Sequence, residues 1–580
     1  MRSFRRHVVA IAAAALSAAL PLPAAAQRGL PKMPAHGQPL PIPGRSMVIT
    51  RYGIVAASQP LAATAGVHML EMGGNAVDAA IAANAANGLM EPAMNGVGGD
   101  LFAIVYIAKT GKIYGLNSSG WSATGMTPQL MASKGLKRIP LRGIWGVTVP
   151  GAVAGWQALH DRFGKLPLST LLAPAIQYAK EGFPVTEVIA DTWAEYLRTL
   201  EARPNAAKTY LIDGHTPREG EIFKNPDLAR TLTRIAQQGR KGFYTGPTAQ
   251  AILATEHQLG GTMTASDLAD FRPQWVTPLH INYRGWTVYE LPPNSQGIGA
   301  LMMLQIMSHF PIGEYGFHAA QSLHVMMEAK QLAYSDVLQY VGDPRLANVP
   351  VAQMLDSAHE AARAAMIDST RAICSEPPSR FSSITSKKGG DTIYLTAIDA
   401  EGNIVSLIQS NYEEFGSGIV PAGMGFVLQD RGALFTLKPD MANTLAPHKR
   451  PLHTLIPGFM QKDSLRIGFG IMGGWNQAQA HAQFVSHIAD FGMSIQQALE
   501  AGRFTKPGFS GCNFDIESRI PKAVRDSLSA MGYDLKLYGP RTGHFGWGQA
   551  VMGTAGGIHY GASDPRHDGA AIPQRLPKRK

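Results

Sequence analysis

The stretch that decides the fold of this chain is Gly389-Gly390-Asp391-Thr392-Ile393-Tyr394-Leu395-Thr396-Ala397-Ile398-Asp399. Two glycines and an aspartate lead into β-branched and aromatic residues, which predicts a buried strand that begins at Thr392. If the bond between Asp391 and Thr392 were cut, Thr392 would carry both a hydroxyl nucleophile and a free α-amine that can serve as its general base. An ordinary strand after a glycine turn is the commoner explanation of such a run, so the rest of the chain must decide between the two.

The N-terminus has the pattern of a secretory signal peptide over residues 1–26. Arg2, Arg5 and Arg6 precede a short alanine-rich apolar run, and Ala24-Ala25-Ala26 offers a small-residue cleavage site. A membrane anchor is the alternative, but the apolar run is too short and is broken by prolines. We therefore expect an exported protein, periplasmic or secreted, with no membrane span after removal of the signal peptide.

The composition indicates a globular protein with a large core, since 45% of the 580 residues are hydrophobic and 16% are charged. Without the three signal-peptide arginines, 49 basic and 42 acidic side chains leave a net charge of +7. Much of this excess lies in residues 575–580, and no dense basic stripe with interleaved aromatic residues occurs elsewhere, which argues against a nucleic-acid partner. The positive charge mildly favours anionic substrates.

The sequence gives no sign of a metal or a cofactor. The two cysteines, Cys374 and Cys512, cannot form a disulfide scaffold or a zinc site; one bridge is possible but is not implied. The 18 histidines show no ligand clustering, and there is no phosphate-binding loop, His-Glu-x-x-His pair or Gly-x-Ser-x-Gly elbow. We expect a small-molecule substrate and no cofactor.

The order of predicted elements indicates one α+β domain. Strand patterns occur near the N-terminus and again from Thr392 onward, whereas residues from about 150 to 380 show mostly helical spacing. Helices are expected at Pro60–Glu71 and Ala76–Met90, and a hairpin at 101–116. A cut before Thr392 would leave a large fragment, 27–391, and a small fragment, 392–580, interleaved in one composite domain.

A pair of glycines offers a second feature of catalytic type. Met472-Gly473-Gly474 follows a predicted strand, and glycines there would let backbone N–H groups approach a ligand closely, as an oxyanion hole requires. An ordinary tight turn is the alternative explanation. The run Gly96-Val97-Gly98-Gly99-Asp100 carries the same ambiguity.

Colinear motifs resemble those of the gamma-glutamyltransferase (gamma-glutamyltranspeptidase) family across essentially the whole mature chain. They are Gly73 to Ala80, Glu91-Pro92, Gly96 to Asp100, Val149 to Gly155, Gly242-Phe243-Tyr244 with Gly246, Tyr340 to Pro344, Gly389 to Thr392, Phe415 to Gly418, Arg450-Pro451, Met472 to Gly474 and Gly561 to Arg566. Several exceed five residues, so chance agreement is excluded in practice.

The resemblance implies an N-terminal-nucleophile hydrolase, with an αββα four-layer sandwich and a proenzyme that cleaves itself. It makes Asp391 and Thr392 the cleavage site and Thr392 the catalytic nucleophile. It assigns Ser410 as a second hydroxyl beside the nucleophile, and Gly473 and Gly474 as the oxyanion hole. The mature protein would be a heterodimer of its own two fragments.

The chain departs from the glutathione-cleaving members at positions that hold glutamate. Asn117 stands in the hairpin where they carry an arginine, and His453-Thr454 replaces a serine pair. Leu434 stands where they have an acidic residue for the α-amine, and Tyr412 replaces an asparagine. Losing such charged partners in a partly buried site typically costs a few kcal/mol each.

The remaining charges suggest a different acyl group. Arg431 and His453 would favour a carboxylate without an amine, although Arg431 could be a solvated surface residue and His453 a packed, hydrogen-bonded histidine. Ser410-Asn411-Tyr412, with Asn411 as a further substrate-binding candidate, resembles a divergent branch with cephalosporin-acylase-like members and an oxamate amidohydrolase.

Three hypotheses follow. The first is a self-processing enzyme that cleaves a gamma-glutamyl or related amide through an acyl-enzyme, passing the acyl group to water or an amine. The second is an amidohydrolase for a carboxylate-bearing acyl group without the α-amine, glutaryl- or oxamate-like. The third, from another class, is an inactive periplasmic binding scaffold, against which the intact Asp391-Thr392 junction and Gly473-Gly474 argue.

Overall fold

Strand β10 (Asp391–Ile398) lies near the middle of a seven-stranded antiparallel sheet, as expected for the stretch around Thr392. The computed structural model describes residues 43–374 and 391–576, so the expected signal peptide lies outside the described residues. The order of this first sheet is β19-β2-β10-β11-β3-β4-β7. The other strands of this sheet are β19 (Ala570–Pro573), β2 (Ile54–Ala57), β11 (Ile404–Tyr412), β3 (Asp100–Ile107), β4 (Lys112–Ser118) and β7 (Gln274–Val276), of which β2 and β11 pair with β10.

A second seven-stranded sheet lies against the first. Its order is β1-β18-β17-β13-β12-β9-β8, again antiparallel throughout. The strands are β1 (Val48–Thr50), β18 (His559–Ser563), β17 (Gly548–Gly553), β13 (Leu465–Ile471), β12 (Gly458–Lys462), β9 (Trp286–Glu290) and β8 (Leu279–Tyr283). Both sheets combine strands from the two predicted fragments, so the fragments interleave.

Side-chain alternation divides the core among the layers. In β3, Phe102, Ile104 and Tyr106 join a cluster with Phe459 and Val551 of the second sheet. The intervening residues Leu101, Ala103 and Val105 join a different cluster with helices on the outer face. Because successive side chains of a strand point to opposite faces, both faces of this sheet are buried.

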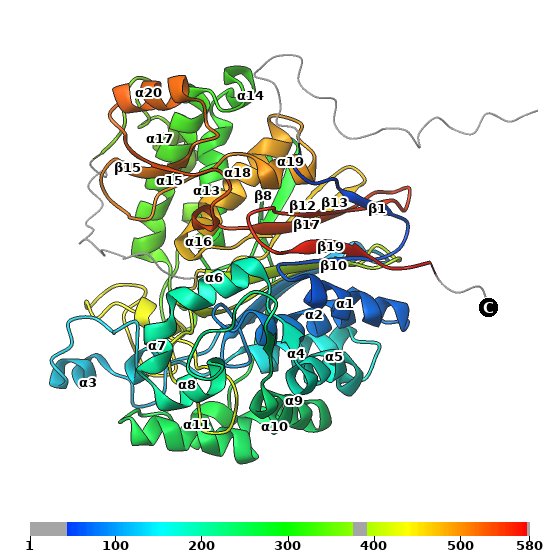
Figure 1. Ribbon diagram of the computed structural model, residues 1–580. Helices are drawn as coiled ribbons and strands as arrows, with labels where there is room; N and C mark the ends of the chain where they lie inside the picture. Colours follow the sequence, from blue (N-terminus) through cyan, green and yellow to red (C-terminus); the bar gives the residue numbers. More distant parts are fainter. Residues whose placement is uncertain (1–42, 375–390, 577–580) are drawn as a thin grey trace, which may run out of the picture. The chain divides into compact units, whose positions relative to one another are not determined.

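Helices cover the outer face of each sheet (Figure 1). Helices α1 (Pro60–Glu71), α2 (Ala76–Met90) and α4 (Ala152–Phe163) pack on the first sheet, with α5 (Leu168–Glu181) and α9 (Pro226–Gln238) beyond them. On the second sheet lie α13 (Gly297–Ser308), α18 (Gln477–Ala489) and α19 (Ile495–Glu500), and α15 (Ala320–Tyr340) packs against α13. An Asn75–Asp78 capping box starts α2.

The α+β prediction is confirmed, and the predicted helices at 60–71 and 76–90 have those bounds. One part of the prediction was incomplete. The region expected to be mostly helical contains β7 and the β8–β9 hairpin, which supply one edge of each sheet. No helix within 43–374 or 391–576 is long and apolar enough to cross a bilayer.

Candidate functional site

The predicted site residues converge at one end of the first sheet. Strand β10 begins at Asp391, and its antiparallel partner β11 ends at Tyr412. Strand β3 then begins at Asp100 opposite Ser410, and β4 ends at Ser118. Because neighbouring strands run in opposite directions, the start of β10 and β3 and the end of β11 and β4 share one sheet edge.

Thr392 sits in a break of the β10–β11 register. Asp391 pairs with Tyr412 and Ile393 with Gln409, so Thr392 lies in a bulge between them. Bulges of this kind re-aim a side chain and are enriched beside active sites. Thr392 is 1% exposed, and its Oγ1 accepts a 3.4 Å hydrogen bond from Gln477 Nε2. The Gln477 Oε1 in turn accepts from the Ile456 N–H, so this amide joins Thr392 to the loop after Pro451.

Ser410 and Tyr412 form the opposite wall. The Ser410 Oγ accepts a 2.7 Å hydrogen bond from the Tyr412 N–H. Tyr412 has a φ of +83°, a left-handed conformation that costs a bulky residue of order 1–3 kcal/mol and occurs mostly at functional sites. Burial raises the pKa of the Tyr412 phenol, so the hydroxyl stays protonated.

The two glycines after β13 have backbone conformations that suit only glycine. Gly473 has a φ of +120° and Gly474 of +56°. Their N–H groups donate to no other described residue. The Gly474 carbonyl is held by Gln296 Nε2 at 3.0 Å, and the same nitrogen donates to the Thr454 carbonyl at 2.6 Å. The turn is therefore fixed while its N–H groups remain available.

Arg431 is fully buried beneath Tyr412, which rules out the solvated surface alternative. Its guanidinium carbon lies 4.6 Å from the centroid of the Tyr412 ring, and its Nη1 donates to the Thr454 Oγ1 at 2.6 Å. Within the described residues, neither Nε nor Nη2 has a hydrogen-bond partner. These two nitrogens form one edge of the guanidinium fork, the edge that binds a carboxylate through two parallel bonds. Burial lowers the pKa of Arg431 to about 10, so it stays charged near neutral pH.

Among the carboxylates around Arg431, Asp100 has the strongest electrostatic effect on it. Its Oδ1 accepts from the Gly120 and Gly151 N–H groups and from Gln429 Nε2, and its Oδ2 contacts His453 Nε2 at 3.0 Å. Burial raises the pKa of Asp100 to about 6, and the Arg431 charge opposes that rise. Asp100 therefore balances the charge of Arg431 without hydrogen-bonding to it.

The other predicted substrate ligands are engaged by the protein. His453 accepts from the Leu455 N–H at Nδ1, which leaves Nε2 to donate to Asp100. Its burial lowers the pKa well below the usual value, so the ring is neutral. Asn117 Oδ1 accepts from Ser119, and Asn117 Nδ2 donates to Asn294; Asn411 Nδ2 donates to the Pro92 carbonyl. The protein therefore holds these side chains in place, although the buried Asn411 Oδ1 has no hydrogen-bond partner among the described residues.

Sequence reasoning did not single out Asp100, Gln296 or Gln477 as individual site residues. Asp100 is the last residue of the glycine-rich run 96–100, which had the pattern of a turn that a ligand can approach closely. The two glutamines lie in helical segments with no local pattern that distinguishes them. Their contacts with residues 85 to 178 positions away define them.

A cavity of about 520 Å³ opens beside the two glycines. Gly473, Trp475 and Asn476 form one wall, and Glu413 and Glu414 follow directly from Tyr412. The rest of the lining comes from both predicted fragments, including Arg142, Glu195 and Tyr196 from the large one and Lys506 and His544 from the small one. A ligand in this cavity would reach the Gly473 turn.

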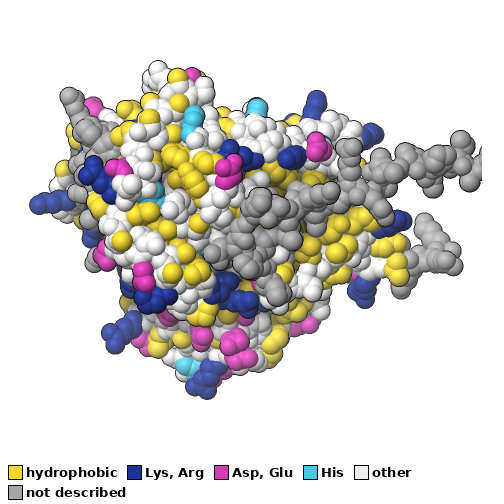
Figure 2. Space-filling model, turned by 90° about the horizontal axis from the view of Figure 1, so that it is seen from above, with side chains coloured by type: hydrophobic (Ala, Val, Ile, Leu, Met, Phe, Trp, Pro, Cys, Tyr) yellow, Lys and Arg dark blue, Asp and Glu magenta, His cyan; other side chains and the backbone are white. Residues whose placement is uncertain are grey.

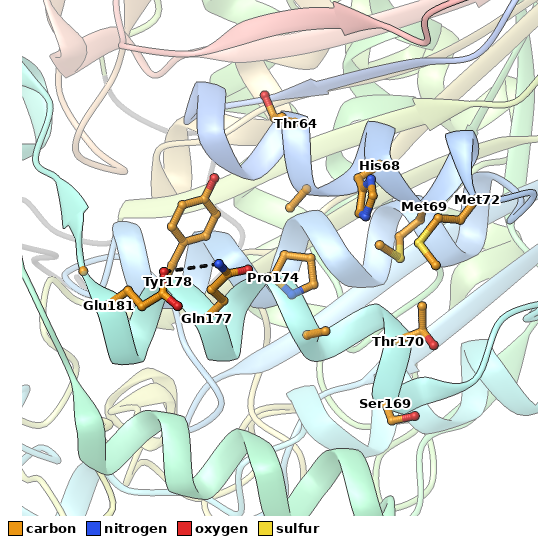
Figure 3. A pocket seen from close by; sticks show the side chains of 13 residues that line it. Thr64, His68, Met69, Met72, Ser169, Thr170, Pro174, Gln177, Tyr178 and Glu181 are labelled. Atoms are coloured by element: carbon orange, nitrogen blue, oxygen red, sulfur yellow. Dashed lines mark hydrogen bonds between the residues drawn. The ribbon is translucent and has the colours of Figure 1, made fainter. Parts of the chain in front are cut away.

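A second cavity of about 580 Å³ lies between α1 and α5 and contains none of the predicted site residues. Figure 3 shows His68 and Met69 of α1, and Met72 directly after it, facing Pro174 and Gln177 of α5, with Gln177 Nε2 donating to Glu181. Its lining includes the hydroxyls of Ser169 and Thr170 and the ring of His68, but no hydrogen bond joins His68 to a hydroxyl in the part of the chain that the structure describes. In residues 43–374 and 391–576, no cluster of His, Cys, Asp or Glu could hold a metal ion.

Comparisons with known proteins agree on one family. A family model described as gamma-glutamyltranspeptidase matches residues 62–574. The chain is 34% identical to the glutathione hydrolase-like YwrD proenzyme of Bacillus subtilis (strain 168), over 90% of this chain and 99% of that protein. It is also 34% identical to the oxamate amidohydrolase proenzyme of Klebsiella pneumoniae, over 90% and 98%. The structure of a cephalosporin acylase from Bacillus halodurans superposes with a TM-score of 0.85 at 38% identity, over 93% of this chain and 99% of that one.

Proposed function

Since the chain belongs to the gamma-glutamyltranspeptidase family, we propose that it is an exported proenzyme that cuts itself before Thr392 and then hydrolyses an amide through an acyl-enzyme. That it is an amidohydrolase of this type follows from the family and its relatives. We further propose the cleavage point, the roles of the residues and the chemical class of the acyl group. We also propose that the two sheets and the helices that cover them form the αββα arrangement of N-terminal-nucleophile hydrolases.

Cleavage of the Asp391–Thr392 bond gives Thr392 its general base. An α-amine has an ordinary pKa of about 7.7 to 8.0, so a useful fraction is neutral near pH 7 to 8. The neutral amine takes the proton of the Thr392 hydroxyl as the oxygen attacks the amide carbonyl. Gln477 Nε2, which contacts Oγ1, holds the hydroxyl in place. Ser410 stands across the strand pair as a second hydroxyl.

The tetrahedral intermediate places negative charge on the former carbonyl oxygen. The Gly473 and Gly474 N–H groups, which have no acceptor among the described residues, are suited to receive that charge. Collapse of the intermediate expels the amine, which takes the proton held by the Thr392 ammonium. Water then attacks the acyl-enzyme by the same route in reverse and releases the acid.

The proposed substrate class rests on two buried nitrogens of Arg431, Nε and Nη2, which have no hydrogen-bond partner among the described residues. Leaving such N–H groups without an acceptor is costly, and a carboxylate presented to both nitrogens would satisfy them. We therefore propose an acyl group that ends in a carboxylate, such as glutaryl or oxalyl. Asn117 and Leu434 occupy the positions where glutathione-cleaving members have charged partners, which argues against recognition of the α-amine there.

A second candidate, a gamma-glutamyl substrate, is favoured by one observation. Glu413 follows Tyr412 directly and lines the cavity beside Gly473, where it could receive an α-ammonium. Parallel assays of glutaryl and gamma-glutamyl p-nitroanilides separate the two candidates. We expect the glutaryl anilide to have the higher kcat/KM; a clear preference for the gamma-glutamyl anilide would select the second candidate instead.

A further inference from the structure

The charges that line the 520 Å³ cavity are not balanced. Arg566 pairs with Glu517 and Asp564, and His544 contacts Asp515. Arg142 and Lys506 donate to backbone carbonyls, which hold these two cations in place without neutralising their charge. The lining has four carboxylates, Asp191, Glu195, Glu413 and Glu414, which outnumber Arg142 and Lys506. Among the described residues, the carboxylates of Asp191, Glu195 and Glu414 have no hydrogen-bond or ion-pair partner.

Glu414 is the decisive member of this set. It is only 8% exposed, yet its carboxylate faces the cavity without a protein donor. Because little of Glu414 contacts water, a cation bound in the cavity would supply a partner that the described residues do not provide. Glu414 belongs to the small predicted fragment and follows the Ser410–Tyr412 segment.

The other two carboxylates come from the large predicted fragment. Asp191 and Glu195 are four residues apart on α6 (Glu187–Glu195), so they lie on one face of the helix together with Thr192. Glu195 is the last residue of α6, where the partial negative charge of the helix end also attracts cations. On the face drawn in Figure 2, acidic and basic side chains are interspersed.

We propose that this cavity binds the amine half of the amide substrate, and that this half carries a positive charge, as in a lysine-like, arginine-like or polyamine group. Gly473 lines the same cavity, so a group bound there would lie beside the turn proposed to hold the oxyanion. The acyl carboxylate would occupy Arg431, which is not part of the lining. This inference rests on the proposed amidase function.

The test holds the acyl group constant and changes one charge on the amine. Wild-type protein is assayed with glutaryl-lysine and glutaryl-norleucine, which differ at the ε-ammonium. We expect kcat/KM to favour the lysine amide by roughly tenfold, and the ratio to fall as salt rises. Glu414→Gln should cut the ratio about fivefold, whereas Glu187→Gln, an exposed residue of α6 outside the lining, should leave it unchanged. A ratio near one, or a ratio that Glu414→Gln does not change, overturns the proposal.

A binding measurement separates this inference from the proposed function. Trp475 lines the cavity, so its fluorescence can follow a titration with lysine amide and with norleucine amide. Tighter binding of lysine amide that is lost in Glu414→Gln supports the cation site even if neither glutaryl amide is hydrolysed. Equal binding of the two amides counts against the site even if both substrates are cleaved.

A disulfide spans the predicted cut between the two fragments. Cys374 and Cys512 form a disulfide, 138 residues apart in sequence, and the predicted cut before Thr392 falls between them. Two hydrogen bonds also hold the segment that ends at Cys374. The Ala372 N–H donates to the Met531 carbonyl, and Gln331 Nε2 donates to the Ile373 carbonyl. We infer that the mature fragments are joined covalently near the end of the large one.

Electrophoresis tests the link directly. After cleavage, we expect one band without reductant and two bands with it, and Cys374→Ser should give two bands under both conditions. Two bands without reductant would overturn the inference. If the chain is uncut, a thiol titration of the denatured protein still decides the pairing: no reactive thiol supports the disulfide, and two refute it.

Discussion

Replacing Arg431 by lysine tests the proposed acyl site most sharply. Lysine keeps the positive charge that balances Asp100 but removes the planar edge formed by Nε and Nη2. A neutral replacement would be a poorer test. Breaking a buried charge network by removing one partner typically costs about 3–5 kcal/mol of stability, which would confuse a folding defect with lost binding.

The expected magnitude follows from the two bonds that the edge would make. Hydrogen bonds to charged groups contribute about 1.5–3 kcal/mol each. Lysine recovers part of one of them, so the net loss is about 2–3 kcal/mol, or roughly 30- to 150-fold in kcat/KM at 1.36 kcal/mol per tenfold. The loss should occur only with substrates that present a carboxylate.

The assay compares glutaryl and pentanoyl p-nitroanilides, which share a chain length and differ at the terminal carboxylate. In Arg431→Lys, kcat/KM for the glutaryl anilide should fall by the factor above, while that for the pentanoyl anilide should change by less than about threefold. Thr454→Val, which removes the acceptor of Arg431 Nη1 and leaves the guanidinium itself, is the matched control and should have a smaller effect. Equal losses on both substrates would refute the assignment of Arg431 as the carboxylate ligand.

Three further predictions concern the catalytic groups. Near pH 7, the log of kcat/KM should rise with pH with unit slope as the Thr392 amine loses its proton. Below about pH 6 the slope should be steeper, because protonated Asp100 cannot accept from all four of its donors. Asp100→Asn should remove only this steeper part of the pH profile. Because the pKa of Asp100 is raised in the folded state, the free energy of unfolding should fall as pH rises from about 4 to about 6. Denaturant titrations at several pH values measure this dependence, and Asp100→Asn should remove the contribution of this carboxyl. Gly473→Ala should lower kcat by about 10- to 100-fold because its φ of +120° would strain alanine by of order 1–3 kcal/mol, whereas Gly539→Ala, in open space, should retain wild-type activity in the same assay.

The fold was predictable where local patterns are strong. Helices 60–71 and 76–90 have clear caps and apolar spacing, and the strand at Thr392 follows from its β-branched run. The β8–β9 hairpin was missed although Leu279 to Tyr283 alternate in burial, because it lies between long helical segments whose periodicity dominates the region. Its place in a sheet depends on β12, some 170 residues away.

The site was predictable in its chemistry and less so in its contacts. Thr392 and the two glycines carry local signals, since a strand start and a glycine pair are visible in sequence. The bonds made by Arg431 and His453 bring together three segments that are distant in sequence: the turn at Arg431, the loop 453–455 and the start of β3 at Asp100. Charge alone could not distinguish a histidine that binds substrate from one that positions Asp100.

The central claim is that the chain cuts itself before Thr392 and uses the new N-terminus as its nucleophile and base. N-terminal sequencing of purified protein, separated on a denaturing gel with reductant because of the Cys374–Cys512 bridge, tests this directly. We predict two fragments for the wild-type protein, the smaller beginning Thr392-Ile393-Tyr394. For Thr392→Ala we predict one uncut, inactive chain. An uncut wild-type chain that hydrolyses amides, or a cut at another bond, would contradict it.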